Sequence, residues 1–181
     1  IALKIGISME EILKRVSTIK AAPGRFEALD CGQNYKVIVD YAHTPDGLEN
    51  ILQTAKAIQE NRIIVVFGCG GDRDATKRPI MGRIAAQYGD VVYVTSDNPR
   101  TEDPVQIVKD VEAGVKEGLR EGSHYEVIVD RREAIQHAIQ NAKPGDIVLI
   151  AGKGHEDYQI LKDKTIHFDD REEARAALKE I

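Results

Sequence analysis

The stretch RIIVVFGCGGDRD, residues 62–74, decides the fold class of this 181-residue chain. Its first half is a continuous apolar run rather than an alternating one, which is typical of a strand that is covered on both faces. Its second half begins at Gly68 as a glycine-rich loop and ends in the charged triplet Asp72-Arg73-Asp74. A buried strand that ends in a polar loop predicts a mostly parallel sheet, with ligands bound at the carboxyl ends of its strands.

Further apolar runs lie on both sides of this stretch, and helix signals fall between them. The predicted strands are Arg25–Cys31, Tyr35–Asp40, Arg62–Phe67, Val91–Thr95, Glu126–Val129, Asp146–Ile150 and Lys164–Phe168. This alternation favours an α/β fold, with a doubly wound, mostly parallel sheet flanked by helices. The turn Gly32-Gln33-Asn34 predicts that the first strand is antiparallel to the second, and the last strand could pair in either direction.

Capping signals predict where the helices begin. The capping-box spacing occurs at Ser8 and Glu11, Asp130 and Glu133, and Asp170 and Glu173. Thr44-Pro45 and Asp103-Pro104 each place a capping side chain before a proline at the first helical position. The first helix is predicted over Ser8 to Ile19, and the break Ala21-Ala22-Pro23-Gly24 predicts a domain boundary after residue 22. The opening IALKIGIS resembles the end of an apolar helix, so we expect a piece of a longer polypeptide.

Composition excludes several classes of function. Hydrophobic residues make up 42% and charged residues 30% of the chain, which is ordinary for a soluble globular protein. The net charge of −5 argues against a nucleic-acid-binding surface. The apolar runs are far too short to span a bilayer, and no secretory leader opens the sequence. Cys31 and Cys69 are far apart, so we expect no disulfide framework and a cytoplasmic location.

Five polar clusters follow predicted strands and should therefore meet at one edge of the sheet. They are Asp40–Asp46, Gly68–Asp74, Ser96–Arg100, Asp130–Arg132 and Ala151–Glu156. A single cluster of this kind means little, but five at the same edge indicate a composite site. Asp97 suits a ligand ammonium group, and the planar fork of Arg100 suits a carboxylate, so this pair predicts a small zwitterionic ligand.

Several of these clusters also have a purely structural interpretation. The Gly68–Gly71 loop lacks the full dinucleotide fingerprint and could be a tight turn. The segment 97–100 could serve only as a turn before the next helix, and Glu156 could be a first-turn carboxylate. A lone histidine such as His43 is more often structural than catalytic. No metal site is expected from the histidine spacing, and no Gly-x4-Gly-Lys-Ser/Thr phosphate loop occurs.

Together the clusters resemble the Mur ligase family over essentially the whole chain. The segments Pro23-Gly24-Arg25-Phe26-Glu27 and Asp40-Tyr41-Ala42-His43-Thr44-Pro45-Asp46 are similar to family-wide motifs on the ATP side. Asp97-Asn98-Pro99-Arg100 and the segment 152–158 resemble the type that takes meso-diaminopimelate, since lysine-adding relatives depart at the Arg position. The resemblance implies a Rossmann-like carboxy-terminal domain over residues 23–181, and residues 1–22 would end the central ATP-binding domain.

The same resemblance implies roles for individual residues. Arg25 would act catalytically at the ATP phosphates, and Asp40 and His43 would also bind the nucleotide. Diaminopimelate would be held by Arg73, Asp97, Asn98, Pro99, Arg100, Gly152 and Glu156. The Pro23-Gly24 region is the expected hinge about which this domain closes over ATP.

The implied reaction is an ATP-dependent amide ligation in peptidoglycan synthesis. ATP with Mg²⁺ phosphorylates the D-glutamate carboxyl of UDP-MurNAc-L-Ala-D-Glu, and an amine of meso-diaminopimelate then attacks the acyl phosphate. The phosphate loop and the magnesium ligands are expected in the central domain, and a UDP-binding amino-terminal domain is expected before it. The chain alone is therefore expected to be inactive.

Two other interpretations stay open. The chain could be a stand-alone Rossmann-like module that binds a nucleotide or an amino acid. It could also belong to a lysine-adding or folylpolyglutamate-type ligase, although the Asp97–Arg100 cluster speaks against both. A dinucleotide-dependent oxidoreductase is disfavoured by the incomplete glycine fingerprint.

Overall fold

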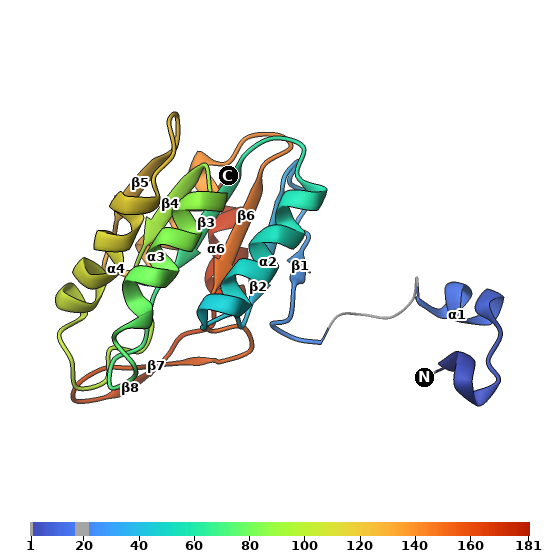
Figure 1. Ribbon diagram of the computed structural model, residues 1–181, viewed down its shortest axis with the longest axis horizontal. Helices are drawn as coiled ribbons and strands as arrows, with labels where there is room; N and C mark the ends of the chain where they lie inside the picture. Colours follow the sequence, from blue (N-terminus) through green and yellow to red (C-terminus); the bar gives the residue numbers. More distant parts are fainter. Residues whose placement is uncertain (1, 17–21) are drawn as a thin grey trace.

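The computed structural model describes residues 2–16 and 22–181, and a six-stranded sheet forms its centre (Figure 1). The sheet has the order β1-β2-β6-β3-β4-β5. The strands are β1 Glu27–Leu29, β2 Lys36–Asp40, β3 Ile63–Phe67, β4 Val91–Val94, β5 His124–Val127 and β6 Ile147–Ala151. Only β1 is antiparallel to its neighbour, and the other four pairings are parallel. The predicted α/β fold with an antiparallel first strand is thus confirmed.

Helices cover both faces of this sheet. One face carries α2 Pro45–Ile58, α3 Lys77–Tyr88 and α4 Pro104–Gly118, and the other carries α5 Arg131–Asn141 and α6 Asp170–Lys179. Consecutive strand residues point to opposite faces, so Ile63, Val65 and Phe67 join the first core, whereas Ile64 and Val66 join the second. Every residue of β3 and β6 is buried, which explains their uninterrupted apolar sequences.

A small hairpin lies beside the carboxyl edge of the sheet. It consists of β7 Tyr158–Ile160 and β8 Thr165–His167, which pair antiparallel with each other in a separate sheet. The last predicted strand is therefore β8 and is not part of the main sheet. The backbone N–H of Arg100 donates to the carbonyl of Ile160, at 3.1 Å, so this hairpin is fastened to the loop that follows β4.

Most of the predicted helix starts are confirmed. Side-chain oxygens accept hydrogen bonds from first-turn N–H groups at Ser8, Thr44, Asp103 and Asp130. The last helix begins one residue earlier than predicted. Asp169 caps α6, and Asp170 lies inside the first turn. Asp170 is instead used in a buried ion pair with Arg131.

The amino-terminal segment contains the short 3-10 helix η1 Ala2–Ile5 and the helix α1 Met9–Val16. No residue of α1 is buried. The predicted continuation of this helix to Ile19 and part of the predicted break at residues 21–24 lie outside the described residues, so the domain boundary stays a prediction. Within residues 2–16 and 22–181, no helix is long and apolar enough to cross a membrane.

Candidate functional site

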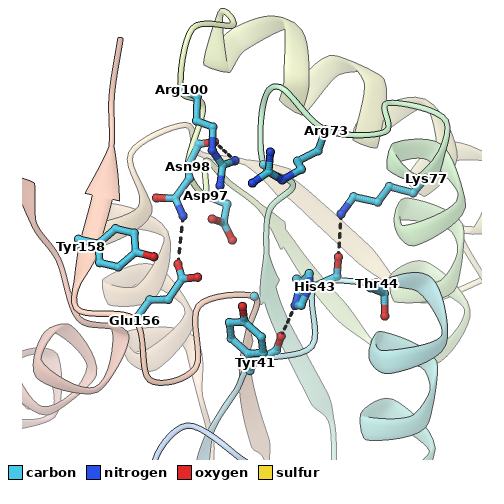
Figure 2. A pocket seen from close by; sticks show the side chains of 12 residues that line it. Tyr41, His43, Thr44, Arg73, Lys77, Asp97, Asn98, Arg100, Glu156 and Tyr158 are labelled. Carbon is cyan, nitrogen blue, oxygen red and sulfur yellow. Dashed lines mark hydrogen bonds between the residues drawn. The ribbon is translucent and has the colours of Figure 1, made fainter. Parts of the chain in front are cut away.

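A polar cavity of about 430 Å³ opens at the carboxyl ends of the parallel strands (Figure 2). It is lined by Tyr41, His43, Thr44, Gly70, Arg73, Lys77, Asp97, Asn98, Arg100, Gly152, Glu156 and Tyr158. Four of the five predicted clusters, those after β2, β3, β4 and β6, therefore meet in one cavity. The fifth cluster, Asp130–Arg132, contributes no lining residue.

One wall of the cavity carries two carboxylates. Asp97 follows β4 and is 7% exposed, and Glu156 follows β6. The amide Nδ2 of Asn98 donates to Glu156 Oε2 at 3.0 Å and holds that carboxylate in place. Gln159 Nε2 donates to the backbone oxygen of Asp97 at 2.7 Å and so holds the backbone from which the other carboxylate extends. Neighbouring carboxylates of this kind suit a ligand ammonium group.

Two guanidinium groups lie away from Glu156, on the far side of the cavity (Figure 2). Arg100 has a backbone φ of 53°, in the left-handed region that few residues with a side chain adopt. Its Nη1 donates to the carbonyls of Gly71, at 2.8 Å, and Asn98, at 3.4 Å. The remaining donors of the fork make no hydrogen bond to the described residues, and together with Arg73 they suit a ligand carboxylate.

Gly152 has a steric role at the bottom of the site. Its φ is 122°, and a Cβ at this position would lie 2.7 Å from Asp97 Oδ2. A side chain here would therefore displace one of the two carboxylates, which explains why glycine stands where β6 ends.

Comparison with known proteins places this site in a family. The family model described as Mur ligase, glutamate ligase domain, matches residues 24–154, which is more than half of the chain. The chain belongs to the Mur ligase family. The Rossmann-like fold expected from the resemblance is confirmed by a solved ligase structure, named for UDP-N-acetylmuramoyl-L-alanyl-D-glutamate and 2,6-diaminopimelate. It matches with a TM-score of 0.81 at 43% identity and covers 99% of this chain and 36% of that one.

Curated members of the Mur ligase family are similar over nearly the whole chain. A UDP-N-acetylmuramoyl-L-alanyl-D-glutamate--2,6-diaminopimelate ligase from Fusobacterium nucleatum is 63% identical over 176 residues, or 97% of this chain. The protein of the same name from Syntrophomonas wolfei is 56% identical over 178 residues, or 98% of this chain. The chain spans only 36% of the length of each of these relatives.

The residues that the Mur ligase resemblance assigns to diaminopimelate nearly all line the cavity. Arg73, Asp97, Asn98, Arg100, Gly152 and Glu156 do so. Pro99 does not: it is buried, and its carbonyl packs so closely on Gly71 that a side chain there would collide with it. Pro99 is thus placed to shape the loop, and the roles of all seven residues stay predictions.

The residues assigned to the nucleotide are less closely grouped. His43 lines the cavity, but Arg25 and Asp40 do not. The Arg25 guanidinium lies 4.5 Å from the centre of the Tyr41 ring, in a cation–π contact. Both Asp40 oxygens accept backbone hydrogen bonds, so the structure gives Asp40 a supporting position below the Tyr41 loop. A direct contact between Asp40 and a nucleotide stays a prediction.

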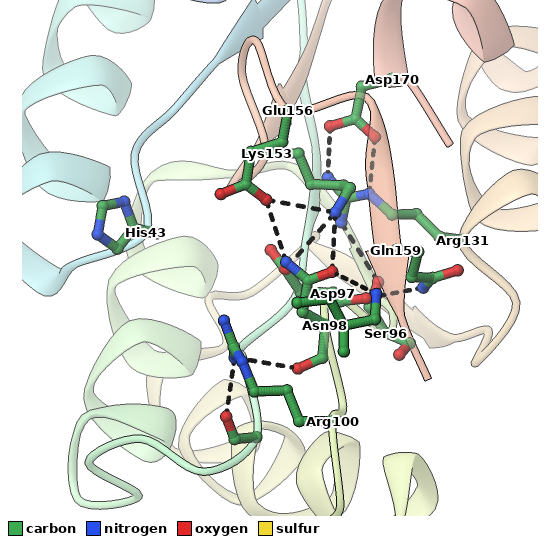
Figure 3. A network of polar contacts seen from close by, with 12 residues as sticks. His43, Ser96, Asp97, Asn98, Arg100, Arg131, Lys153, Glu156, Gln159 and Asp170 are labelled. Atoms are coloured by element: carbon green, nitrogen blue, oxygen red, sulfur yellow. Dashed lines mark hydrogen bonds and ion pairs between the residues drawn. The ribbon is translucent and has the colours of Figure 1, made fainter. Parts of the chain in front are cut away.

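Beneath the cavity lies a buried polar layer whose arrangement the sequence did not reveal (Figure 3). Arg131 and Asp170 form an ion pair of 2.7 Å, and both side chains are fully buried. Arg131 Nη2 also donates to the carbonyl of Ala151, at 3.0 Å. Burial lowers the pKa of Arg131, but the Asp170 carboxylate outweighs it and raises the pKa. The fifth predicted cluster thus supports the site from below and does not contact the ligand space.

The site offers binding groups rather than a nucleophile. Burial raises the pKa of the Cys69 thiol, which lies in the glycine-rich loop, to about 12, so a thiolate is not available at neutral pH. In the described part of the chain, no three His, Cys, Asp or Glu side chains are grouped so that they could hold a metal ion. The chemistry that the geometry supports is the orientation of a charged small molecule.

Proposed function

We propose that this chain is the amino-acid-binding part of an ATP-dependent ligase that adds meso-diaminopimelate to UDP-MurNAc-L-Ala-D-Glu in cytoplasmic peptidoglycan synthesis. The observation that carries the proposal is that groups of both charges line one cavity. Asp97 and Glu156 provide carboxylates, and Arg73 and Arg100 provide guanidinium groups. Diaminopimelate has an amine and a carboxylate at each end, and the relatives named as diaminopimelate ligases support the same substrate.

The proposed role of these side chains is to hold one end of the acceptor. The carboxylates bind its ammonium group, and the guanidinium groups bind its carboxylate. The amine at the other end then stays available to attack the activated carboxyl of the dipeptide. Holding the nucleophile in a fixed position converts an encounter between two molecules into a reaction within one complex.

Two cations lie near His43 and Tyr41: Lys77 lines the same cavity, whereas Arg25 does not line it. Lys77 Nζ donates to the carbonyl of His43 at 2.9 Å, and Arg25 stacks on Tyr41. We assign these cations to the phosphates of the nucleotide, where they would offset charge during transfer. Bound ATP with Mg²⁺ would supply the phosphoryl group that activates the D-glutamate carboxyl of the dipeptide. Following the resemblance to the Mur ligase family, we assign the magnesium ligands to the central domain of the full-length enzyme.

Arg100 provides the reason to prefer diaminopimelate to lysine. Lysine has the same side-chain amine but lacks the second carboxylate, so it would leave the guanidinium without its ionic partner. Sites built to pair with a polar group commonly reject analogues that lack it by more than about a hundredfold.

The deciding experiment uses the full-length gene product with UDP-MurNAc-L-Ala-D-Glu and ATP. Addition of meso-diaminopimelate is compared with addition of L-lysine as the ratio of kcat/KM values. A strong preference for diaminopimelate supports both the proposed reaction and the proposed specificity for that acceptor. A preference for lysine supports an amide ligase but refutes the proposed specificity. No turnover with either, from a folded enzyme, favours a stand-alone binding module.

The 181-residue chain by itself is proposed to have no ligase activity. It contains no phosphate loop of the Gly-x4-Gly-Lys-Ser/Thr type, so activation of the carboxyl would need residues from outside it. The purified chain should form no tripeptide product in the assay in which the full-length enzyme is active. Product formation by the chain alone would overturn this assignment.

A further inference from the structure

Lys153 is a fully buried lysine directly below the carboxylate wall of the cavity (Figure 3). Its Nζ lies 3.1 Å from Asn98 Oδ1, 3.5 Å from Glu156 Oε2 and 4.0 Å from Asp97 Oδ1. All three partners line the cavity, whereas Lys153 itself does not. Its ammonium group therefore contacts the proposed ligand-binding side chains from the side opposite to the ligand.

The surroundings of Lys153 fit its charged form. An ammonium group has three N–H donors and no acceptor, and the nearby amide and carboxylate oxygens are all acceptors. Its Nζ also lies 5.6 Å from the centre of the Tyr158 ring, which favours a cation. Burial lowers the pKa of Lys153, and the carboxylates, with Asp97 the strongest, oppose this shift.

We infer that Lys153 is a positioning residue of the amine subsite, which orients the Asn98 amide and holds the Asp97 and Glu156 carboxylates in place for a ligand ammonium group. The inference rests on the proposed function and deepens it, because it assigns a determinant of acceptor binding to a residue that does not touch the acceptor.

The orientation of Asn98 follows from its hydrogen bonds. Its Oδ1 accepts from Lys153 Nζ and from the backbone N–H of Ile160, at 2.9 Å. Its Nδ2 is thereby directed to Glu156 Oε2. If the Asn98 amide were flipped, its NH₂ group would face the N–H donors of Lys153 and Ile160. Glu156 would then lose the hydrogen bond that holds it. Lys153 thus fixes Asn98, and through it the position of Glu156.

The charge balance leads to the same conclusion. Asp97 and Glu156 with Lys153 leave one net negative charge, which matches a single ligand ammonium group. The other buried cation, Arg131, is already paired with Asp170 in direct contact. Arg100, which lies on the same loop as Asp97, directs its Nη1 to the carbonyl of Gly71. Lys153 therefore offsets part of the repulsion between the two carboxylates.

The test compares two lysine variants in the full-length enzyme. Lys153→Met keeps the apolar length of the side chain and removes the charge, and the melting temperature records the loss of stability that follows when one member of a buried charged group is removed. The control is Lys36→Met, because Lys36 lies at the opposite end of β2, is exposed and pairs with Glu60. The KM values for meso-diaminopimelate and ATP are measured together with kcat and the melting temperature.

Lys153→Met is expected to raise the KM for meso-diaminopimelate by about tenfold or more, as expected when hydrogen bonds to charged groups are lost. The KM for ATP and kcat should change little, because the contacts of Lys153 Nζ are with the proposed acceptor-binding side chains. Lys36→Met should match the wild type. Equal changes in all parameters or an unchanged KM for diaminopimelate would overturn the inference.

A second variant decides the question if Lys153→Met does not fold. Lys153→Arg keeps the positive charge but alters the geometry, so it should raise the KM for meso-diaminopimelate by less than about tenfold and leave kcat and the KM for ATP unchanged. An equal change in all three parameters, or a rise as large as that expected for Lys153→Met, would overturn the inference. Wild-type turnover reports separately on the proposed function. If the wild type prefers L-lysine, the same comparison is made with L-lysine, and if it turns over neither acceptor, calorimetric binding of meso-diaminopimelate replaces KM.

Discussion

At the scale of the single residue, Arg100 carries the specificity of the proposed site. Its left-handed backbone costs on the order of 1 kcal/mol for a residue with a Cβ. The cost is offset by the contacts that this conformation permits, since the Arg100 N–H donates to Ile160 and the side chain to Gly71. The strained backbone thus holds the guanidinium at the cavity wall.

Arg100→Ala in the full-length enzyme should raise the KM for meso-diaminopimelate by about a hundredfold, because a charged hydrogen-bonding partner of the ligand carboxylate is lost. The KM for ATP should change by less than about threefold, since Arg100 lies away from the proposed nucleotide side. Steady-state kinetics with each substrate varied in turn checks both values. Arg83→Ala, which removes an exposed arginine of α3 paired with Glu117, is the control. Equal losses for both substrates would contradict the assignment of Arg100.

The sequence was informative about residues at strand ends and less so about their support. Arg73, Asp97 and Glu156 could be grouped in advance because each follows a parallel strand, and such ends share one edge. The pairing of Arg131 with Asp170 could not be predicted, because no local pattern joins residues 39 positions apart. The burial of Lys153 was also hidden, since a lysine between two glycines is usually exposed.

At the scale of the element, the strands and helices that could be predicted were those with a clear hydrophobic pattern. The strands β3 and β6 are continuous apolar runs and were predicted within one residue of their bounds. The three-residue strand β7 lies outside the main sheet and has no such apolar run. It pairs with β8 and contacts the loop after β4 through the hydrogen bond from Ile160 N–H to Asn98. The helix α3 was not delimited either, since its buried face uses Arg78, Gly82 and small residues in place of an apolar stripe.

The packing of Gly24 bears on the hinge that was expected at Pro23-Gly24. Gly24 is buried, has a φ of 66°, and a Cβ there would collide with the backbone of Gly154 and His155. Its N–H donates to Glu27 Oε2 at 2.7 Å. Gly24 is therefore clamped against the loop that carries Glu156, and this geometry does not favour free rotation at Gly24.

Gly24→Ala should destabilise the domain by more than about 2 kcal/mol, because it adds a steric clash to the cost of a left-handed backbone. Gly122→Ala is the matched control, since Gly122 has a φ of 80° and nothing within 4 Å of its Cβ position. That control should lose only about 1 kcal/mol. Urea unfolding of the two variants measures the difference. Equal losses would show that Gly24 is not clamped.

At the scale of the whole molecule, the two edges of the sheet have different tasks. The carboxyl edge holds the cavity and several polar groups directed toward a ligand. The opposite edge is closed by internal contacts around Asp146, whose side chain is fully buried. Asp146 Oδ1 accepts from the backbone N–H of Arg62 at 3.0 Å, Oδ2 accepts from that of Lys143 at 2.9 Å, and Arg62 Nη2 adds an ion pair of 2.6 Å. Stability and binding should therefore be separable by mutation.

Asp146→Asn tests this separation. Burial raises the pKa of Asp146, but the hydrogen bonds from Arg62 and Lys143 outweigh it and hold the pKa below its usual value. The stabilisation is then fully present above the unfolded-state value of about 4 and is lost as the pH falls through the lower, folded-state pKa. The free energy of unfolding of the variant should be lower by about 2–4 kcal/mol at neutral pH, and the loss should shrink in acid, where the wild type also carries a protonated Asp146.

Urea unfolding across a pH series measures this loss for Asp146→Asn, and Asp163→Asn, at an exposed position, is the control. In the full-length enzyme the KM for diaminopimelate should stay at the wild-type value, and a rise comparable to that of Arg100→Ala would show that the two edges are coupled.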